Sequence, residues 1–271
     1  IQLDQQQLIN SRRTISVIVA VNNQRDFLEQ LNDDLHHMLK KRDQSFEILY
    51  VDDGSTDGTW PLLRKICDNS TRVRIMKLRT SFGESAVLEA AMEQVKGDRV
   101  IFYSSRVRVN PSDLDAMLKK LDDNTDLVVG VRYPRRDSGL NQVVSRIFNK
   151  ITSRVTDMKL QDVNSGVIAV RREVLENVPF YGALNAFLPI LAHRQGYRIA
   201  EEKVEQMSGH FDQSLYPKDY IRRFLDLISV MFLSKYSKKP LHFLGFFGAI
   251  LTGTGLLIDL YLFFYRILGF G

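Results

Sequence analysis

Two adjacent carboxylates, Asp52 and Asp53, open the segment VDDGSTDGT directly after a short apolar run, and Asn22 follows an earlier apolar run in the same way. Carboxylate and amide groups at strand ends suit the hydroxyls of a ribose and the N–H edge of a base. Phosphates prefer glycine-rich backbone N–H groups or cations. The sequence contains neither GxGxxG nor GxxxxGK[ST], the usual phosphate-binding motifs. These residues therefore predict a pocket for a nucleoside.

A third polar stretch follows the apolar residues of RVIFYSSRVRVNP, at 99–111. Its strand-end residues are Ser104, Ser105 and Arg106. Hard divalent cations need carboxylate oxygens, which a serine and a guanidinium do not provide. We therefore predict no metal at Ser104 to Arg106, where the fixed positive charge of Arg106 would also repel a cation.

The elements that position these residues alternate between strand and helix. Short apolar runs predict strands, and apolar residues at three-and-four spacing predict the helices between them. This alternation predicts an α/β fold, a mostly parallel sheet with helices on both faces, whose ligands bind beyond the carboxyl ends of the strands. The expected strands are 15–21, 46–51, 73–78, 99–103, 126–131, 163–170 and 197–204, and the expected helices include 27–39, 84–95, 112–121, 134–159 and 171–178.

Composition limits the class of protein. A chain of 271 residues that is 44% hydrophobic can bury one substantial core. The formal net charge is +5, but the basic residues are spread along the chain without interleaved aromatics, so we expect no nucleic-acid partner. Cys67 is the single cysteine, which excludes an intramolecular disulfide and fits a reducing compartment.

The carboxyl-terminal part predicts a membrane anchor. Residues 241–268 are predominantly apolar, with Asp259 as the single carboxylate, and they are long enough to cross about 30 Å of hydrocarbon as a helix. The preceding segment, 217–240, is amphipathic and predicts a helix in the membrane interface. A polar lead, 1–13, precedes the first predicted strand.

The charges around the predicted span indicate orientation and association. Lys235, Lys238 and Lys239 precede the span and only Arg266 follows it, which places the globular domain on the cytoplasmic side. A carboxylate within the span costs a few kcal/mol if it faces lipid. We therefore expect Asp259 either to face a neighbouring helix, such as that of a second copy in a homo-oligomer, or to lie near the far interface of the membrane.

Over about residues 14–131, the segments ISVIVAVNN, EILYVDDGSTDGT, SFGESAVLEAAMEQVKGDRVIF and NPSDL together resemble the family-2 glycosyltransferases of GT-A fold. The segments GVRYPRRDSGLNQVVSRIFNKI, DVNSGVIAVRREVL and QGYRIAEEKVE resemble the branch that transfers a sugar to a polyprenyl phosphate, as dolichyl-phosphate mannose synthases do. The resemblance implies a GT-A domain over 14–216.

The resemblance also implies the ligands. The donor would be a UDP- or GDP-sugar, and the acceptor would be a polyprenyl phosphate in a membrane. The positions implied for binding the nucleotide are Val19, Ala20, Asn22, Asp52, Asp53, Ser104 and Arg106.

The chain departs from the family at positions that matter for catalysis. In the family the strand at 99–103 ends in D-x-D, whose carboxylates hold Mg²⁺ or Mn²⁺, but here those positions are Ser104 and Arg106. The family has an arginine at the position of Ile168. It often has a lysine after Phe-Gly, where this chain has Glu84. Two interpretations stay open. Either Arg106, alone or together with Arg108, replaces the metal in a divergent transferase that needs no metal cofactor, or the protein is a catalytically inactive pseudo-glycosyltransferase acting as an interaction or regulatory subunit.

Overall fold

The structure is a computed structural model that describes residues 14–42, 44–136, 146, 149, 160–162, 165–178, 187–208 and 240–267. The chain divides into two units, Ile1–Asp226 and Leu227–Gly271, and each is described by itself. The predicted polar lead and nearly all of the predicted helix at 134–159 lie outside the described residues. So does the predicted amphipathic segment, except its last residue.

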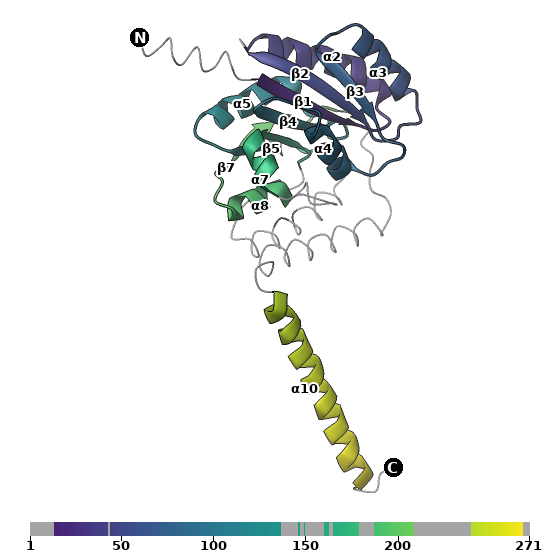
Figure 1. Ribbon diagram of the computed structural model, residues 1–271, viewed down its shortest axis with the longest axis vertical. Coiled ribbons are helices and arrows are strands. Elements are labelled where there is room, and N and C mark those ends of the chain that lie inside the picture. The colour runs from purple at the N-terminus through teal and green to yellow at the C-terminus, as the bar shows by residue number, and fades with distance from the viewer. Residues whose placement is uncertain are drawn as a thin grey trace. The chain divides into compact units, whose positions relative to one another are not determined.

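The first unit is built on a seven-stranded sheet with the strand order β3-β2-β1-β4-β6-β5-β7 (Figure 1). All strands run parallel except β6, which pairs antiparallel with both β4 and β5. The carboxyl ends of the six parallel strands therefore share one edge with the amino end of β6. The strands are β1 (Thr14–Val21), β2 (Ser45–Asp52), β3 (Val73–Lys77), β4 (Arg99–Ser104), β5 (Leu127–Arg132), β6 (Val167–Arg171) and β7 (Ile199–Val204).

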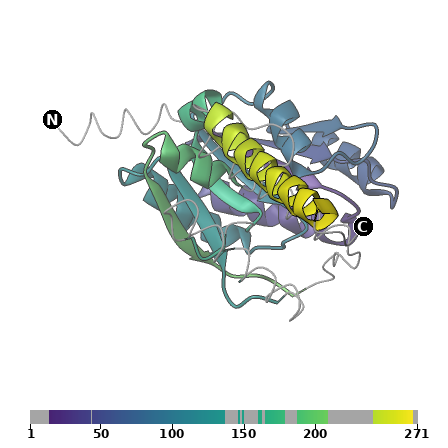
Figure 2. The same ribbon diagram turned by 90° about the horizontal axis from the view of Figure 1, so that it is seen from below.

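Helices cover both faces of this sheet (Figures 1 and 2). One layer contains α2, α3 and α5, whose buried side chains join the core cluster, whereas α4 packs against β1 and β2 from the other side. The helical elements are α2 (Arg25–Lys40), α3 (Thr59–Asp68), α4 (Glu84–Met92), the 3₁₀ turn η1 (Pro111–Asp113), α5 (Leu114–Asp122), α7 (Arg172–Asn177) and α8 (Leu188–Arg194).

The central strand β1 shows why the apolar runs become buried strands. Successive side chains of a strand point to opposite faces of the sheet. Val17 and Val19 join the core cluster with α2, α3 and α5, whereas Ile18, also fully buried, points to the opposite face. A strand covered on both faces must be apolar at nearly every position, which is the pattern of 15–21.

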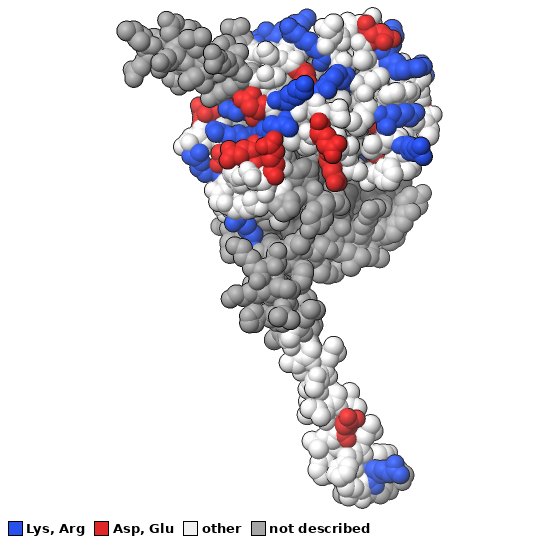
Figure 3. Space-filling view, viewed as in Figure 1, with Lys and Arg blue, Asp and Glu red and all other residues white. Residues whose placement is uncertain are grey.

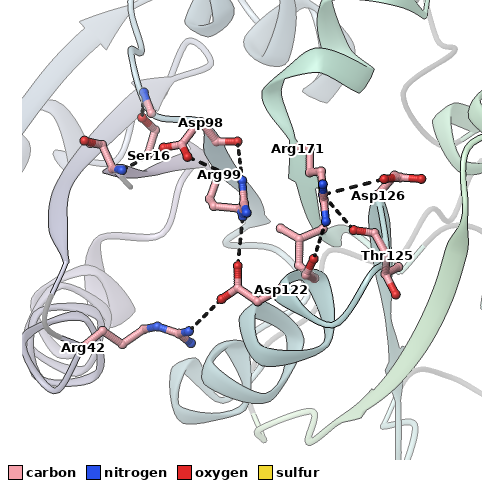
Figure 4. Close-up of polar contacts among 11 residues, drawn as sticks. Ser16, Arg42, Asp98, Arg99, Asp122, Thr125, Asp126 and Arg171 are labelled. Atoms are coloured by element: carbon pink, nitrogen blue, oxygen red, sulfur yellow. Dashed lines mark hydrogen bonds and ion pairs between the residues drawn. The ribbon is translucent and has the colours of Figure 1, made fainter. Parts of the chain in front are cut away.

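Ion pairs join the elements at the amino edge of the sheet (Figure 4). Arg99, at the start of β4, is buried, and its Nε lies 3.1 Å from Oδ1 of Asp122 at the end of α5. The other oxygen of Asp122 accepts a hydrogen bond of 3.3 Å from Arg42, which follows α2. Arg171, at the end of β6, donates to the carbonyl oxygen of Thr125 at 2.9 Å. These contacts hold α2, α5 and two strands together far from the carboxyl ends of the strands.

The second unit contains α10 (Pro240–Ile267). Its part Gly248–Ile267 is long and apolar enough, by length and composition, to cross a membrane. Asp259 is exposed on this helix. Figure 3 shows α10 almost free of charge, whereas the visible face of the first unit carries lysine, arginine and acidic side chains interspersed.

Candidate active site

The turn after β1 and the loop after β2 are joined by side-chain hydrogen bonds. Asn22 Nδ2 donates to the carbonyl oxygen of Asp53 at 2.6 Å. The backbone N–H of Asn23 donates to Ser55 Oγ at 2.9 Å, and Asn23 Oδ1 accepts from the backbone N–H of Thr56 at 2.9 Å. Asn23 has a left-handed φ of 51°, which asparagine tolerates better than most residues. Asn22 therefore shapes the edge of the site by holding the two loops together.

The carboxylate of Asp53 organises a third loop, between β3 and α4. Its Oδ1 accepts from the backbone N–H of Phe82 at 2.7 Å. Its Oδ2 accepts from Ser81 Oγ at 2.8 Å and from the backbone N–H of Gly83 at 3.0 Å. Asp53 is 3% exposed, and its own N–H donates to the carbonyl oxygen of Val21. Both of its oxygens are therefore engaged within the protein.

Asp52, its neighbour, has a free oxygen. The residue is fully buried at the end of β2, where Oδ1 accepts from the backbone N–H of Ser55 at 2.9 Å. Oδ2 has no hydrogen-bond partner among the described residues. A buried carboxylate oxygen without a partner is costly, so this atom marks a place where a donor from a ligand would be stabilising.

Close packing of backbone limits the room beside Asp52. Gly54 has φ of 69°, and a Cβ added there would lie 2.7 Å from the backbone nitrogen of Ser81. Only glycine therefore allows the loop after β2 to pass against the loop before α4. The two loops form one continuous wall at the carboxyl end of β2.

Val19 and Ala20, two of the positions predicted to bind the nucleotide, are buried near the end of β1. Val19 is fully buried and belongs to the core cluster. Ala20 is 6% exposed, and its carbonyl oxygen accepts from the backbone N–H of Ser105 at 3.0 Å. Ala20 therefore contributes through its backbone, by joining the end of β1 to the loop after β4.

The end of β4 carries a carboxylate that comes from another element. Ser104 is fully buried, and its hydroxyl donates a hydrogen bond to Glu84, the first residue of α4. Its backbone N–H donates to the carbonyl oxygen of Gly166 at 2.8 Å. The hydroxyl of Ser105 is buried without a hydrogen-bond partner among the described residues. The pairing of Ser104 with Glu84 was not predicted from the sequence, because 20 residues separate the two.

The two arginines of the loop after β4 have different surroundings. Arg106 is partly buried and makes no hydrogen bond or ion pair with the residues that the structure describes. Arg108 is 7% exposed and donates to Gln24 Oε1. Arg106 is therefore the cation of this loop that is available to a ligand.

Comparison with known proteins identifies the family. The model of the glycosyl transferase family 2 matches residues 16–178, more than half of the chain. The chain belongs to glycosyl transferase family 2. The predicted family membership is confirmed.

Two relatives of the chain are named as polyprenyl-phosphate sugar synthases or transferases. A dodecaprenyl-phosphate galacturonate synthase of Rhizobium johnstonii is 29% identical over 254 residues, covering 92% of this chain and 75% of the relative. An undecaprenyl-phosphate 4-deoxy-4-formamido-L-arabinose transferase of Serratia proteamaculans is 27% identical over 259 residues, covering 94% of this chain and 78% of the relative. The predicted similarity to the polyprenyl-phosphate sugar transferases is confirmed.

Solved structures show the same fold. Glucosyl-3-phosphoglycerate synthase from Mycobacterium tuberculosis, in complex with Mn²⁺, UDP and glucosyl-3-phosphoglycerate, matches with a TM-score of 0.62 at 19% identity, covering 82% of this chain and 79% of that chain. A second mycobacterial protein matches with a TM-score of 0.65 at 19% identity, covering 85% and 77%. The predicted GT-A fold and its mostly parallel sheet are confirmed, and β6 is the antiparallel strand.

The residues at the end of β4 do not fit the divalent metal that the family-2 resemblance implies. The Ser104 hydroxyl donates to a carboxylate, and Arg106 carries a positive charge that would repel a cation. Within the described ranges, no group of three His, Cys, Asp or Glu side chains is placed to hold a metal ion. We derive no catalytic step through a metal.

The antiparallel strand β6 brings further residues to the same edge. Asp162, which precedes β6 and is 1% exposed, accepts from Arg132 at the end of β5 through both oxygens, at 2.7 and 2.9 Å. Ile168, where the family resemblance implied an arginine, is 8% exposed on β6, opposite Phe102 of β4. That position is therefore part of the apolar packing of the sheet.

Proposed function

We propose that this chain is a membrane-associated glycosyltransferase that moves a sugar from a nucleotide donor to a polyprenyl phosphate. Its membership of family 2 supports the transfer reaction. The names of its relatives support a polyprenyl phosphate acceptor. The apolar helix α10 supports residence at a membrane, where such an acceptor is found. The lysines before this helix favour a cytoplasmic position for the first unit.

The observation that carries the proposal is the pairing of a free acceptor with a free cation at one edge of the sheet. Asp52 Oδ2 is buried without a partner in the described structure, at the end of β2. Arg106 lies without a partner there, just beyond β4. Both strands are neighbours of β1, so their ends are about 10 Å apart at the usual strand spacing. That distance suits a ligand with N–H or O–H donors at one end and phosphates at the other.

The roles follow from these positions. Asp52 accepts from the base or the ribose, and Arg106 neutralises the diphosphate. An oxygen of the acceptor phosphate attacks the anomeric carbon of the sugar as the bond to the diphosphate oxygen breaks. The guanidinium of Arg106 stabilises the negative charge on the departing diphosphate, the role that a metal has elsewhere. The acceptor is already anionic and needs little help from a general base.

A radiolabel transfer assay tests this function. The full chain, in proteoliposomes that contain undecaprenyl phosphate, is incubated with labelled UDP- and GDP-sugars, with and without EDTA. We expect label in the lipid fraction with one donor, at a rate that EDTA does not change. Activity that depends on added Mg²⁺ or Mn²⁺ would contradict the role of Arg106.

An inactive protein is the second outcome that the assay can reveal. The replacement of D-x-D by Ser104 and Arg106 favours this candidate. Binding of UDP or GDP without transfer from any donor would support a pseudo-glycosyltransferase. Absence of binding by either nucleotide would reject the proposed site altogether.

A further inference from the structure

Two arginines of one short loop, Arg106 and Arg108, are separated by a single residue and have opposite surroundings. We propose that Arg108 is a positioning residue, which holds the loop 104–108 in the conformation that leaves the guanidinium of Arg106 free for a ligand. This inference rests on the proposed function, because Arg106 is the group that Arg108 would position. It assigns Arg108 no contact with substrate.

The guanidinium of Arg108 is held from three directions. Its Nη2 and Nε lie 2.9 and 3.3 Å from Gln24 Oε1. Nη2 also lies 3.2 Å from each carboxylate oxygen of Asp26. The group is stacked over the ring of Phe27, 4.9 Å from its centroid. All three partners belong to the beginning of α2, so Arg108 joins this helix to the loop after β4.

The backbone of the loop needs such a restraint. Arg108 has φ of 47°, in the left-handed region that residues with a side chain rarely adopt. The N–H of Val107 donates to the carbonyl oxygen of Ser104, which closes a tight turn, and the carbonyl oxygen of Arg108 accepts from the N–H of Met207 at 2.8 Å. A conformation of this kind persists only where surrounding contacts fix it.

Packing against β6 limits the loop on its other side. Gly166 has φ of 73°, and a Cβ added there would lie 2.9 Å from Cγ1 of Val107. The carbonyl oxygen of Val107 also accepts from Gln206 Nε2 at 3.2 Å. Val107, which is partly buried, is therefore held on this side, and a rotation of the loop that released Arg108 would displace Arg106 as well.

Burial decides which partner of Arg108 matters more. Gln24 is 4% exposed, whereas the side chain of Asp26 is 71% exposed. Loss of the Gln24 oxygen would leave a buried guanidinium without its enclosed acceptor. Loss of Asp26 would be compensated by water, because exposed ion pairs contribute little. Gln24 also receives support from α3, since its N–H donates to Thr59 Oγ1 at 3.2 Å.

Limited proteolysis tests the position of the loop without any need for activity. Trypsin cleaves after arginine, so the rate of cleavage between Arg106 and Val107 in the full chain, in detergent micelles, reports how often the loop opens. We expect R108Q and Q24A to raise this rate at least tenfold, and D26A to change it less than twofold. Cleavage after Arg132, which is buried at the end of β5, is the control for global unfolding.

Two results would overturn the inference. One is an unchanged rate of cleavage after Arg106 in both R108Q and Q24A. The other is a D26A rate that equals the Q24A rate, because the buried contact would then have no special part. Should R108Q fail to fold, Q24A still decides, since it leaves Arg108 in place.

Nucleotide binding tests whether Arg108 acts through Arg106. Affinities for UDP and GDP are compared among wild type, R106A, R108Q and the double variant. We expect R108Q to lose most of the affinity that R106A loses, and the double variant to match R106A within twofold. Effects that multiply would show an independent contribution of Arg108 and would overturn the claim. If the wild type binds neither nucleotide, the proposed function fails, while the cleavage experiment still decides the role of Arg108.

Discussion

The hydroxyl of Ser104, the last residue of β4, donates a hydrogen bond to the carboxylate of Glu84, the first residue of α4. A negative charge therefore lies beside a strand end that carries no acidic residue of its own. The acidic group beside the end of β4 therefore comes from α4, the helix that packs against β1 and β2.

A carboxylate introduced at Ser104 should conflict with Glu84. Ser104→Asp places two like charges in contact at a buried position, and we expect the free energy of unfolding to fall by about 2 kcal/mol. Urea unfolding followed by the fluorescence of Trp60, the single tryptophan, measures it. Ser104→Asn is the neutral control, and Glu84→Gln should restore the stability of Ser104→Asp. Equal stability of the Asp and Asn variants would show that the two side chains do not meet.

Removal of the free cation should weaken binding of the diphosphate. For Arg106→Ala we expect the affinity for UDP or GDP to fall by about 10- to 100-fold, the effect of losing one hydrogen bond to a charged group. The transfer rate should fall by about 100-fold or more. Calorimetric titration measures the affinity. Arg64→Ala, which removes an exposed arginine of α3, is the matched control and should bind as the wild type does.

The adjacent aspartates should separate binding from stability. Asp52→Asn keeps an acceptor for the N–H of Ser55, so we expect the free energy of unfolding to change by less than about 1 kcal/mol while nucleotide affinity falls. Asp53→Asn loses charge-assisted bonds to the loop before α4, so we expect a loss of about 2 kcal/mol. Thermal unfolding and titration on both variants check this. If Asp52→Asn lowered stability and Asp53→Asn lowered nucleotide affinity instead, the roles assigned to the two aspartates would be wrong.

The ion pairs at the amino edge of the sheet should respond to loss of their shared carboxylate. Asp122→Ala leaves the buried Arg99 without its main partner, and we expect a loss of about 2 kcal/mol in the free energy of unfolding. Asp115→Ala should cost less than about 1 kcal/mol, because Arg42 keeps Asp122. Urea unfolding compares them. Adding Arg99→Met to Asp122→Ala should recover much of the loss, and failure to do so would show that the charge is not the cause.

The stabilisation from Asp57 should depend on pH. Burial raises the pKa of Asp57, but hydrogen bonds from the hydroxyl and N–H of Thr59 and from the N–H of Arg25 outweigh it and hold the pKa below its usual value. A depressed carboxyl pKa stabilises the fold above the unfolded value, and this contribution is lost as pH falls through the folded value.

We therefore expect Asp57→Ala to cost about 1 kcal/mol at neutral pH, and the difference from wild type to shrink below about pH 4. Unfolding curves between pH 3 and 7 measure the difference. Asp57→Asn is the control that keeps an acceptor without a charge. A difference that stays constant across this range would contradict the role of the carboxylate.

The fold was predictable because each strand and most helices have a pattern of apolar residues within their own short segment, and this pattern recurs along the chain. The runs that become β1, β4 and β5 are buried on both faces, so most positions in them are apolar, and the helices each carry a stripe of apolar residues that is buried. The direction of β6 was not predictable, because an apolar run reads the same in a parallel or antiparallel strand. The short helix α8 was not predicted from the sequence.

The candidate site was predictable only in part. Parallel strands end at the same edge of a sheet, so the sequence predicts that Asp52 and Ser104 lie at one edge. It does not predict which hydrogen bonds they form, since Asp52 and Asp53 are identical residues with different partners. The same holds for Arg106 and Arg108. Burial of one member of such a pair depends on contacts between loops that are distant in sequence.

The bonds that join the turn after β1 to the loop after β2 also bear on how the protein would choose its ligand. Asn22 is bonded to Asp53, and Asn23 to Ser55 and Thr56, without a ligand, so little chain would have to become ordered on binding. A nucleotide would meet a surface of fixed shape, and a base of the wrong outline would be rejected by steric exclusion at first encounter. Selectivity of this kind is expressed before any closure of the protein around its ligand, and it would act on free nucleotides as strongly as on their sugars.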